Sequence, residues 1–208
     1  LEEDGKVSEL EQIRTINQIA NLEFIIQNEQ KGLGHAILCA ENFVDGDSFA
    51  VLLGDTICVG EPNCTKALVD IFHDKKSSIF SVEEINLEET KRYGVVSGHE
   101  HEEGIQIVDK LVEKPGPESA PSLLGIQGRY IFTSELFSHL KLVRSDKDNQ
   151  IQLTDAMNSL AQVQQMYSWI FKGKRYDIGT MKDWFQSHLE LSIASEFSPI
   201  IKEVLNKL

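Results

Sequence analysis

The chain has 208 residues, of which 41% are hydrophobic and 25% are charged, as in an ordinary globular protein that can bury a sizeable core. Its 20 Lys and Arg residues against 33 Asp and Glu residues give a net charge of −13. This balance argues against nucleic-acid or anionic-membrane partners, which require clustered cations. No stretch of the sequence approaches the length of an apolar membrane span.

Helix and strand patterns alternate in the first quarter of the chain. Apolar residues recur every three positions over residues 7–19, which predicts a helix. The apolar run at 22–27 has the length of a strand, and residues 35–41 have helical composition. Residues 49–55 form an apolar run that ends in Gly-Asp. This run predicts a central strand, covered on both faces, in a mostly parallel sheet.

Strands outnumber helices in the middle of the chain. Strands are predicted at 78–82, 93–97, 105–113, 125–132, 166–171 and 175–178. Helices are predicted at 65–75, 88–92, 134–140, 153–163, 181–194 and 199–205, with Thr154 near the N-cap of the fourth. Successive strands indicate some antiparallel pairs. We therefore predict a single α/β domain with a mixed, mostly parallel central sheet flanked by helices.

The three cysteines, Cys39, Cys58 and Cys64, lie in or beside apolar segments. Their odd number does not suggest a disulfide framework, and their spacing does not suggest a zinc site. We expect reduced thiols in the core of a cytoplasmic protein, and no signal peptide is visible.

Two glycines, Gly32 and Gly34, stand between a predicted strand and a predicted helix. Glycine lets a ligand approach the backbone closely, and a helix start attracts acceptor groups. The same pattern also makes an ordinary tight turn. His35, which follows, is either a ligand or a packed helix residue.

Four charged residues follow predicted strands. Asp55 and Asp177 each stand at a strand end, where they either cap the next turn or meet to hold Mg²⁺ against a phosphate. Glu113 ends the strand predicted at 105–113 and Lys114 follows it directly, so their side chains should diverge. They either contact a ligand or form a surface ion pair. These residues suggest an α/β enzyme that handles a phosphorylated ligand with Mg²⁺.

Seven short motifs then occur in a characteristic order. They are Gly32-Leu-Gly-His-Ala36, Leu53-Gly-Asp55, Tyr93-Gly94-Val-Val96, Val112-Glu113-Lys114-Pro115, Gly128-Arg-Tyr130, Ile151-Gln-Leu-Thr-Asp-Ala156 and Tyr176-Asp177-x-Gly179. In these motifs the chain resembles the bacterial UTP–glucose-1-phosphate uridylyltransferases (UDP-glucose pyrophosphorylases) of the sugar nucleotidyltransferase superfamily. The likeness runs from about Lys6 to Leu208. It implies one Rossmann-like nucleotidyltransferase domain over residues 1–208.

The resemblance implies a reaction and its partners. A uridylyl group would pass from UTP to glucose 1-phosphate, giving UDP-glucose and pyrophosphate, without a covalent enzyme intermediate. It also implies Mg²⁺ as cofactor and a cytoplasmic homo-oligomer. Two alternatives stay open: another nucleotide or sugar phosphate, such as dTTP or mannose 1-phosphate, and a non-catalytic module that binds nucleotide sugars.

At the nucleotide end, the resemblance assigns roles to four residues. Gln27 would read the uracil edge through its amide, and Gly32 through its backbone. Asp55 and Asp177 would be catalytic as the two carboxylates that hold the metal.

At the sugar end, the resemblance assigns roles to three more residues. Gly94 would contact the sugar through its backbone, and Glu113 would accept hydrogen bonds from glucose hydroxyls. Lys114 would meet the sugar phosphate, both as a binding residue and as a catalytic cation.

The sequence also departs from the family pattern. The family opens with a strand and a glycine-rich loop carrying Gly-Thr-Arg, which cradles the triphosphate, and Arg14 of this chain cannot replace that loop. Thr56 and Gln150 stand where the family often has acids. We expect the 208-residue chain alone to turn over UTP and glucose 1-phosphate negligibly. It is either part of a full enzyme, which the retained acids and Lys114 favour, or a short inactive homologue.

Overall fold

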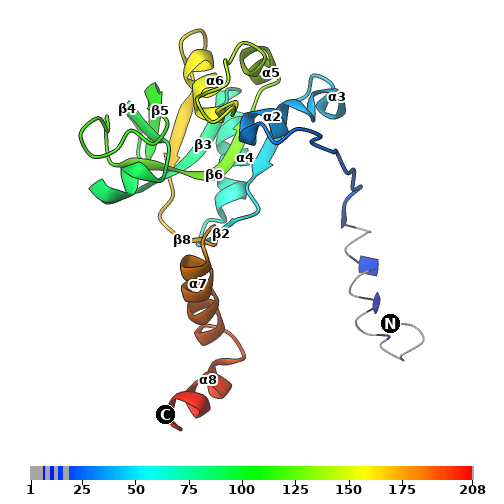
Figure 1. The fold of residues 1–208 in the computed structure, drawn as a ribbon, viewed down its shortest axis with the longest axis vertical. Coiled ribbons are helices and arrows are strands. Elements are labelled where there is room, and N and C mark those ends of the chain that lie inside the picture. Colours follow the sequence, from blue (N-terminus) through cyan, green and yellow to red (C-terminus); the bar gives the residue numbers. More distant parts are fainter. Residues whose placement is uncertain (1–6, 8–9, 12–13, 16–18, 208) are drawn as a thin grey trace.

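The computed structural model describes residues 7, 10–11, 14–15 and 19–207. A six-stranded sheet lies at its centre (Figure 1). In spatial order its strands are β1 (Phe49–Leu52), β6 (Leu124–Phe132), β3 (Ile79–Glu84), β7 (Tyr167–Ile170), β5 (Ile105–Val112) and β4 (Val95–Glu102). A separate two-stranded ribbon pairs β2 (Thr56–Val59) with β8 (Lys174–Asp177).

Helices cover both faces of the sheet. The helical elements are α2 (Gly32–Leu38), α3 (Glu41–Val44), α4 (Cys64–Lys75), η1 (Leu87–Lys91), α5 (Glu135–Leu140), α6 (Leu153–Ala161), α7 (Met181–Ile193) and α8 (Ser198–Leu205). Side chains of the inner strands alternate between two apolar clusters. Ile79 and Ile131 pack with α4, whereas Phe80 and Phe132 pack with α2, α5 and α6. The clusters fix the sheet between two helical layers.

Local capping explains where two helices begin. Asn63 accepts a hydrogen bond from the Lys66 backbone N–H at the start of α4. Thr180 accepts one from the Asp183 backbone N–H at the start of α7, in agreement with the helix predicted from residue 181. The side chain of Thr154 does not cap α6, which instead begins after Gln152.

Backbone contact joins α2 to the segment before α6. Gly34 donates a backbone hydrogen bond to the Ile151 carbonyl, and Ile151 donates one to the Lys31 carbonyl. A Cβ atom on Gly34 would lie 2.6 Å from the Ile151 carbonyl oxygen. Glycine is therefore needed at this position for close packing rather than for a ligand.

The mixed α/β class is confirmed, but the prediction of a mostly parallel sheet is wrong. Of the described pairings in the six-stranded sheet, only β3 with β7 is parallel. β1 and β3 do run in the same direction on either side of α4, as the alternating pattern suggested. However, β6 is inserted between them and is antiparallel to both. The periodicity of a segment does not reveal which distant strand becomes its neighbour.

Two strand predictions also need correction, and one strand was missed. The segment at 22–27 is not assigned to a strand, and Phe24 within it is 87% exposed. Strand-forming residues make a strand only where a neighbour accepts their hydrogen bonds. β1 is not central, because among the described residues it pairs with β6 alone. β2 was not predicted.

The helix predicted over 7–19 falls mostly outside the described residues, and the described ones, 7, 10–11, 14–15 and 19, are helical. At the other end of the chain, α7 and α8 run away from the sheet beyond the β2–β8 ribbon (Figure 1). No helix in the described part of the chain combines the length and hydropathy of a membrane-crossing segment.

Candidate active site

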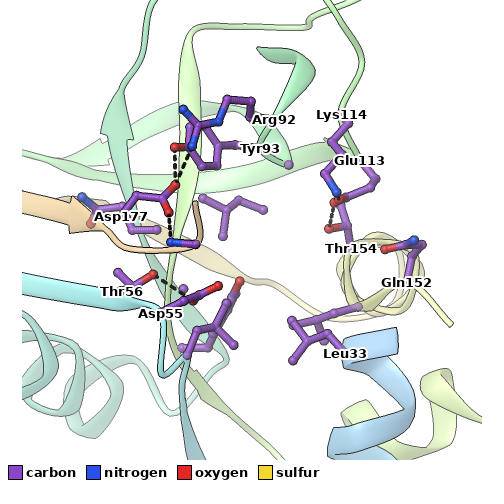
Figure 2. Close-up of a pocket in the computed structure, with 18 of the residues that line it drawn as sticks. Leu33, Asp55, Thr56, Arg92, Tyr93, Glu113, Lys114, Gln152, Thr154 and Asp177 are labelled. Atoms are coloured by element: carbon purple, nitrogen blue, oxygen red, sulfur yellow. Dashed lines mark hydrogen bonds and ion pairs between the residues drawn. The ribbon is translucent and has the colours of Figure 1, made fainter. Parts of the chain in front are cut away.

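A cleft of about 580 Å³ opens beside β6, within the range of roughly 300–1,000 Å³ that is usual for ligand sites. Figure 2 shows Asp55 and Asp177 on one side of it and Glu113 and Lys114 on the other. Gly94 also lines the cleft. Five of the seven predicted site residues are therefore brought together, although they come from segments far apart in the sequence.

Asp177 lies at the end of β8 and receives hydrogen bonds on both carboxylate oxygens. Its Oδ2 accepts from the Tyr93 hydroxyl at 2.5 Å, from Arg92 at 3.2 Å and from Arg175 at 3.3 Å. Its Oδ1 accepts from the Gly179 backbone N–H at 2.9 Å. Burial opposes ionisation, but these bonds and the two guanidinium charges outweigh it, so the pKa of Asp177 lies below its usual value.

The two strand-end carboxylates converge on Gly179. A Cβ atom there would lie 3.1 Å from Asp177 Oδ1 and 3.7 Å from Asp55 Oδ2. Two carboxylates that border one space suit Mg²⁺, which takes hard oxygen ligands and usually completes its shell with water and phosphate oxygens. The donor set therefore fits this ion. In the part of the chain that the structure describes, no group of three or more His, Cys, Asp or Glu side chains forms a metal site from protein ligands alone.

The opposite end of the cleft is built around Glu113. The Thr154 hydroxyl, from the first turn of α6, donates to Glu113 Oε2 at 2.7 Å. A Cβ atom on Gly94 would lie 3.1 Å from Glu113 Oε2 and 3.2 Å from Thr154 Oγ1. Glycine at position 94 therefore leaves this carboxylate open to a ligand.

Glu113 and Lys114 do not diverge as predicted. β5 ends at Val112, and the backbone of Lys114 is left-handed, with a φ of 44°. The alternation of a strand therefore no longer applies, and Lys114 Nζ lies 3.5 Å from Glu113 Oε1. The turn brings the acid and the cation together at one end of the cleft.

Gln27 and Gly32 do not line the cleft. Gln27 donates its amide N–H to the Gly32 carbonyl at 3.1 Å, and the same nitrogen lies 3.0 Å from His35 Nδ1. Leu33, the next residue of α2, does line the cleft. The two residues thus lie beside the cleft, and their proposed contact with uracil stays a prediction.

The charge of the cleft differs from that of the whole chain. Its lining acids are Asp55, Glu113 and Asp177, and its lining cations are Arg92, Lys114 and Arg175. Their formal charges cancel, whereas the chain carries −13. The cleft can therefore accept phosphate groups that the rest of the surface would repel.

Arg175 joins the carboxylate end of the cleft to the central sheet. Its side chain is only 9% exposed and forms ion pairs with Asp177 and with Glu83 of β3. Gln127 donates its amide N–H to the other Glu83 oxygen at 3.2 Å. Arg175 also lies over the Tyr93 ring, 4.4 Å from its centroid. These contacts hold Asp177 in place.

Four residues of the site were not predicted: Arg92, Tyr93, Thr154 and Arg175. Tyr93 and Thr154 belong to motifs quoted above, and Arg92 and Arg175 each stand next to a motif. Their proximity to the motifs was the available signal. Their roles depend on which distant carboxylate each side chain reaches, which the sequence does not show.

Comparisons with known proteins agree with the geometry. The sequence matches the nucleotidyl transferase family over residues 3–192. A UTP–glucose-1-phosphate uridylyltransferase of Bacillus subtilis is 39% identical over 212 residues, covering 100% of this chain and 73% of the relative. One of Staphylococcus epidermidis is 37% identical over 209 residues, with the same coverage. The crystal structure of a UDP-glucose pyrophosphorylase complexed with UDP-glucose has a TM-score of 0.86 and 35% identity, and covers 92% of this chain and 73% of that one.

Proposed function

The chain belongs to the nucleotidyl transferase family, and from this membership we propose that it transfers the uridylyl group of UTP to glucose 1-phosphate, giving UDP-glucose and pyrophosphate. The observation that carries this function is the division of one cleft into two chemically different ends. Asp55 and Asp177 converge at one end, and Glu113, Thr154 and Gly94 cluster at the other. This division suits a substrate with a sugar at one end and a phosphate chain at the other.

At the sugar end, the residues bind and orient glucose 1-phosphate. Glu113 accepts hydrogen bonds from glucose hydroxyls while Thr154 holds its second oxygen. Lys114, whose side chain is 55% exposed, reaches the phosphate as a mobile point charge. The bound phosphate oxygen then attacks the α-phosphorus of UTP, and pyrophosphate leaves. Because no protein nucleophile takes part, the chain contributes positioning and charge neutralisation.

At the carboxylate end, Asp55 and Asp177 would hold Mg²⁺. This ion, when bound, neutralises phosphate charge as the transferred group moves. Arg92 lies at the rim, where it donates to Asp183 at 2.7 Å as well as to Asp177. Tyr93 and Arg175 keep the Asp177 carboxylate ionised and pointed at Gly179.

The substrate assignment is tested by binding with matched ligands. Isothermal titration in the presence of Mg²⁺ compares UDP-glucose with UDP-mannose and dTDP-glucose. UDP-glucose is expected to bind at least about tenfold more tightly than either, because polar groups left unpaired by the wrong ligand cost free energy. Pyrophosphate release from UTP with glucose 1-phosphate measures the reaction itself in an active enzyme, since the 208-residue chain alone is expected to turn over negligibly. Preference for dTDP-glucose, or for dTTP in turnover, would assign the site to a different nucleotide.

The outer helices supply a self-association surface. Exposed apolar residues recur every four positions along α7, and every three or four positions from the turn before α8 onward, which gives each helix an apolar stripe. They are Met181, Phe185, Leu189, Ile193, Phe197, Ile200 and Val204. A stripe of this kind can pair with itself across a two-fold axis, so its occupant is a second copy of the chain.

The free thiols and the nucleotide substrate suit a cytoplasmic enzyme.

A further inference from the structure

Two cysteines lie together behind the carboxylate end of the cleft. Cys58 is in β2 and is half-buried, and Cys64 is the first residue of α4 and is buried. Both belong to the apolar cluster on the α4 side of the sheet, Cys64 as a buried member and Cys58 as a partly buried residue packed against it. Residues 59–63 turn the chain back from β2 to α4, so a short loop connects the pair.

The surroundings make the two thiols unequal. The interaction with the Cys64 thiol lowers the pKa of Cys58 to about 7, although burial opposes this, and the charges of Arg129 and Arg175 contribute in the same direction. Arg175 is the residue opposite Cys58 in the β2–β8 ribbon. The interaction with Cys58 and burial raise the pKa of Cys64. Cys58 is thus the more readily ionised and the more accessible of the two thiols.

We propose that Cys58 and Cys64 are a modification site, a dithiol that a hydroperoxide converts into a disulfide linking β2 to α4. The Cys58 thiolate attacks one oxygen of hydrogen peroxide. The O–O bond breaks, hydroxide leaves and takes up a proton, and Cys58 becomes a sulfenic acid. The Cys64 sulfur then attacks the Cys58 sulfur, the S–O bond breaks, and water leaves with the Cys64 proton. Two thiols lose two electrons, and the peroxide is reduced to two waters.

Reversal requires a reductant, which a low-molecular-weight thiol supplies by exchange with the disulfide. The third cysteine is a natural control. Cys39 follows α2 and is not a member of the apolar cluster that holds the pair. Oxidant should therefore act on the pair and leave Cys39 as a thiol.

Peptide mapping after mild oxidation tests the pair. The purified protein is treated with one equivalent of hydrogen peroxide, and its remaining thiols are blocked with N-ethylmaleimide. It is then cleaved before aspartate, which places Cys58 and Cys64 in one peptide, residues 55–69, and Cys39 in another. Residues 55–69 are expected to be two hydrogen masses lighter and unalkylated, while the Cys39 peptide carries one maleimide. Dithiothreitol should restore two alkylation sites.

Variants separate the two steps. Cys64→Ser should leave Cys58 as a sulfenic acid that dimedone traps, Cys58→Ser should leave Cys64 unreactive, and Cys39→Ser should behave as the wild type. Circular dichroism checks that each variant is folded, and the wild-type measurement stands even if one is not. Two maleimides on residues 55–69 after peroxide would overturn the proposal. So would a sulfinic acid on Cys58 with Cys64 unmodified, or disulfides between chains through Cys39.

Discussion

Asp177 shows how surrounding donors can orient one carboxylate and favour its ionised form. Tyr93 and Arg175 approach one of its oxygens, and the Gly179 N–H approaches the other. These donors fix the orientation of the side chain in the folded protein, so no further conformational entropy is lost when a ligand binds to it. The negative charge of Asp177 therefore lies beside Gly179, where the Asp55 carboxylate also lies.

The first prediction follows from that charge. Asp177→Asn keeps the shape of the side chain but removes the charge, so the active enzyme should lose about a hundredfold or more in kcat/KM while remaining folded. Asp55→Asn should behave alike. The matched control is Asp70→Asn on α4, an exposed residue paired only with Lys66. Activity of Asp177→Asn that is unchanged at limiting Mg²⁺ would mark Asp177 as a structural residue.

The second prediction concerns the opposite end of the cleft. Glu113→Gln should raise the KM for glucose 1-phosphate by about tenfold or more, since a charged hydrogen bond contributes roughly 1.5–3 kcal/mol. The KM for UTP should change much less. Steady-state kinetics with each substrate varied in turn measures both. Glu103→Gln, which alters a side chain that is 90% exposed, is the control. A larger effect on UTP would place Glu113 at the nucleotide end.

Thr154 gives a third prediction, because its hydroxyl orients Glu113. Thr154→Val keeps the shape and removes the donor, so the KM for glucose 1-phosphate should rise roughly three- to tenfold, with a smaller change in kcat. Thr154→Ser retains the hydroxyl and should stay near the wild type. If both variants behave alike, then the packing of the methyl group, and not the hydrogen bond, is what Thr154 contributes.

Among the elements, the β2–β8 ribbon has the most direct effect on the cleft. It carries Asp177 at its end, and it begins at Thr56, the residue after Asp55. The ribbon is separate from the main sheet, so its position depends on side-chain contacts. Arg175 provides such a contact by bridging Asp177 to Glu83. The geometry of the two carboxylates thus depends on how the ribbon is fixed to the sheet.

The fourth prediction tests that bridge. Arg175→Met leaves the partly buried Glu83 without its cation, so the free energy of unfolding in urea should fall by about 1–3 kcal/mol. The neighbouring Lys174→Met breaks an ion pair with Glu190 in which the lysine is 59% exposed. It should cost less than about 1 kcal/mol. Equal effects of the two variants would show that Arg175 does not fix the ribbon.

On the scale of the whole molecule, the outer helices contribute little to the buried core. Ser187 is the only buried residue of α7, and α8 has none. Because helical stability comes largely from packing of an apolar face, helices with so little packing in the monomer would gain stability from a partner. The apolar stripe along them is where that partner would bind.

The fifth prediction concerns that stripe. Ile200→Lys combined with Val204→Lys places two charges in it and should shift the assembly toward the monomer in sedimentation equilibrium. Leu142→Lys, which alters a single apolar side chain that is 77% exposed in a loop, should leave the assembly unchanged. A wild-type protein that is monomeric at all concentrations would rule out self-association through α7 and α8.

The sequence alone determined the features that depend on neighbouring residues. The helices predicted from residues 65 and 181 begin at Cys64 and Met181, and the strands of the middle region lie close to their predicted positions. The motifs placed Asp55, Gly94, Glu113, Lys114 and Asp177 in one site, and all five line the cleft. Periodicity and capping act over a few residues, so they can be recognised without the fold.

Only the tertiary structure decided which distant segments meet. The insertion of β6 between β1 and β3 made the sheet mostly antiparallel, and the segment at 22–27 has no described strand to pair with. Lys114 turned toward Glu113 because its backbone leaves the strand, and Arg175 reached both Asp177 and Glu83. Such contacts are formed by groups far apart along the chain, and their free energy depends on packing that no local pattern encodes.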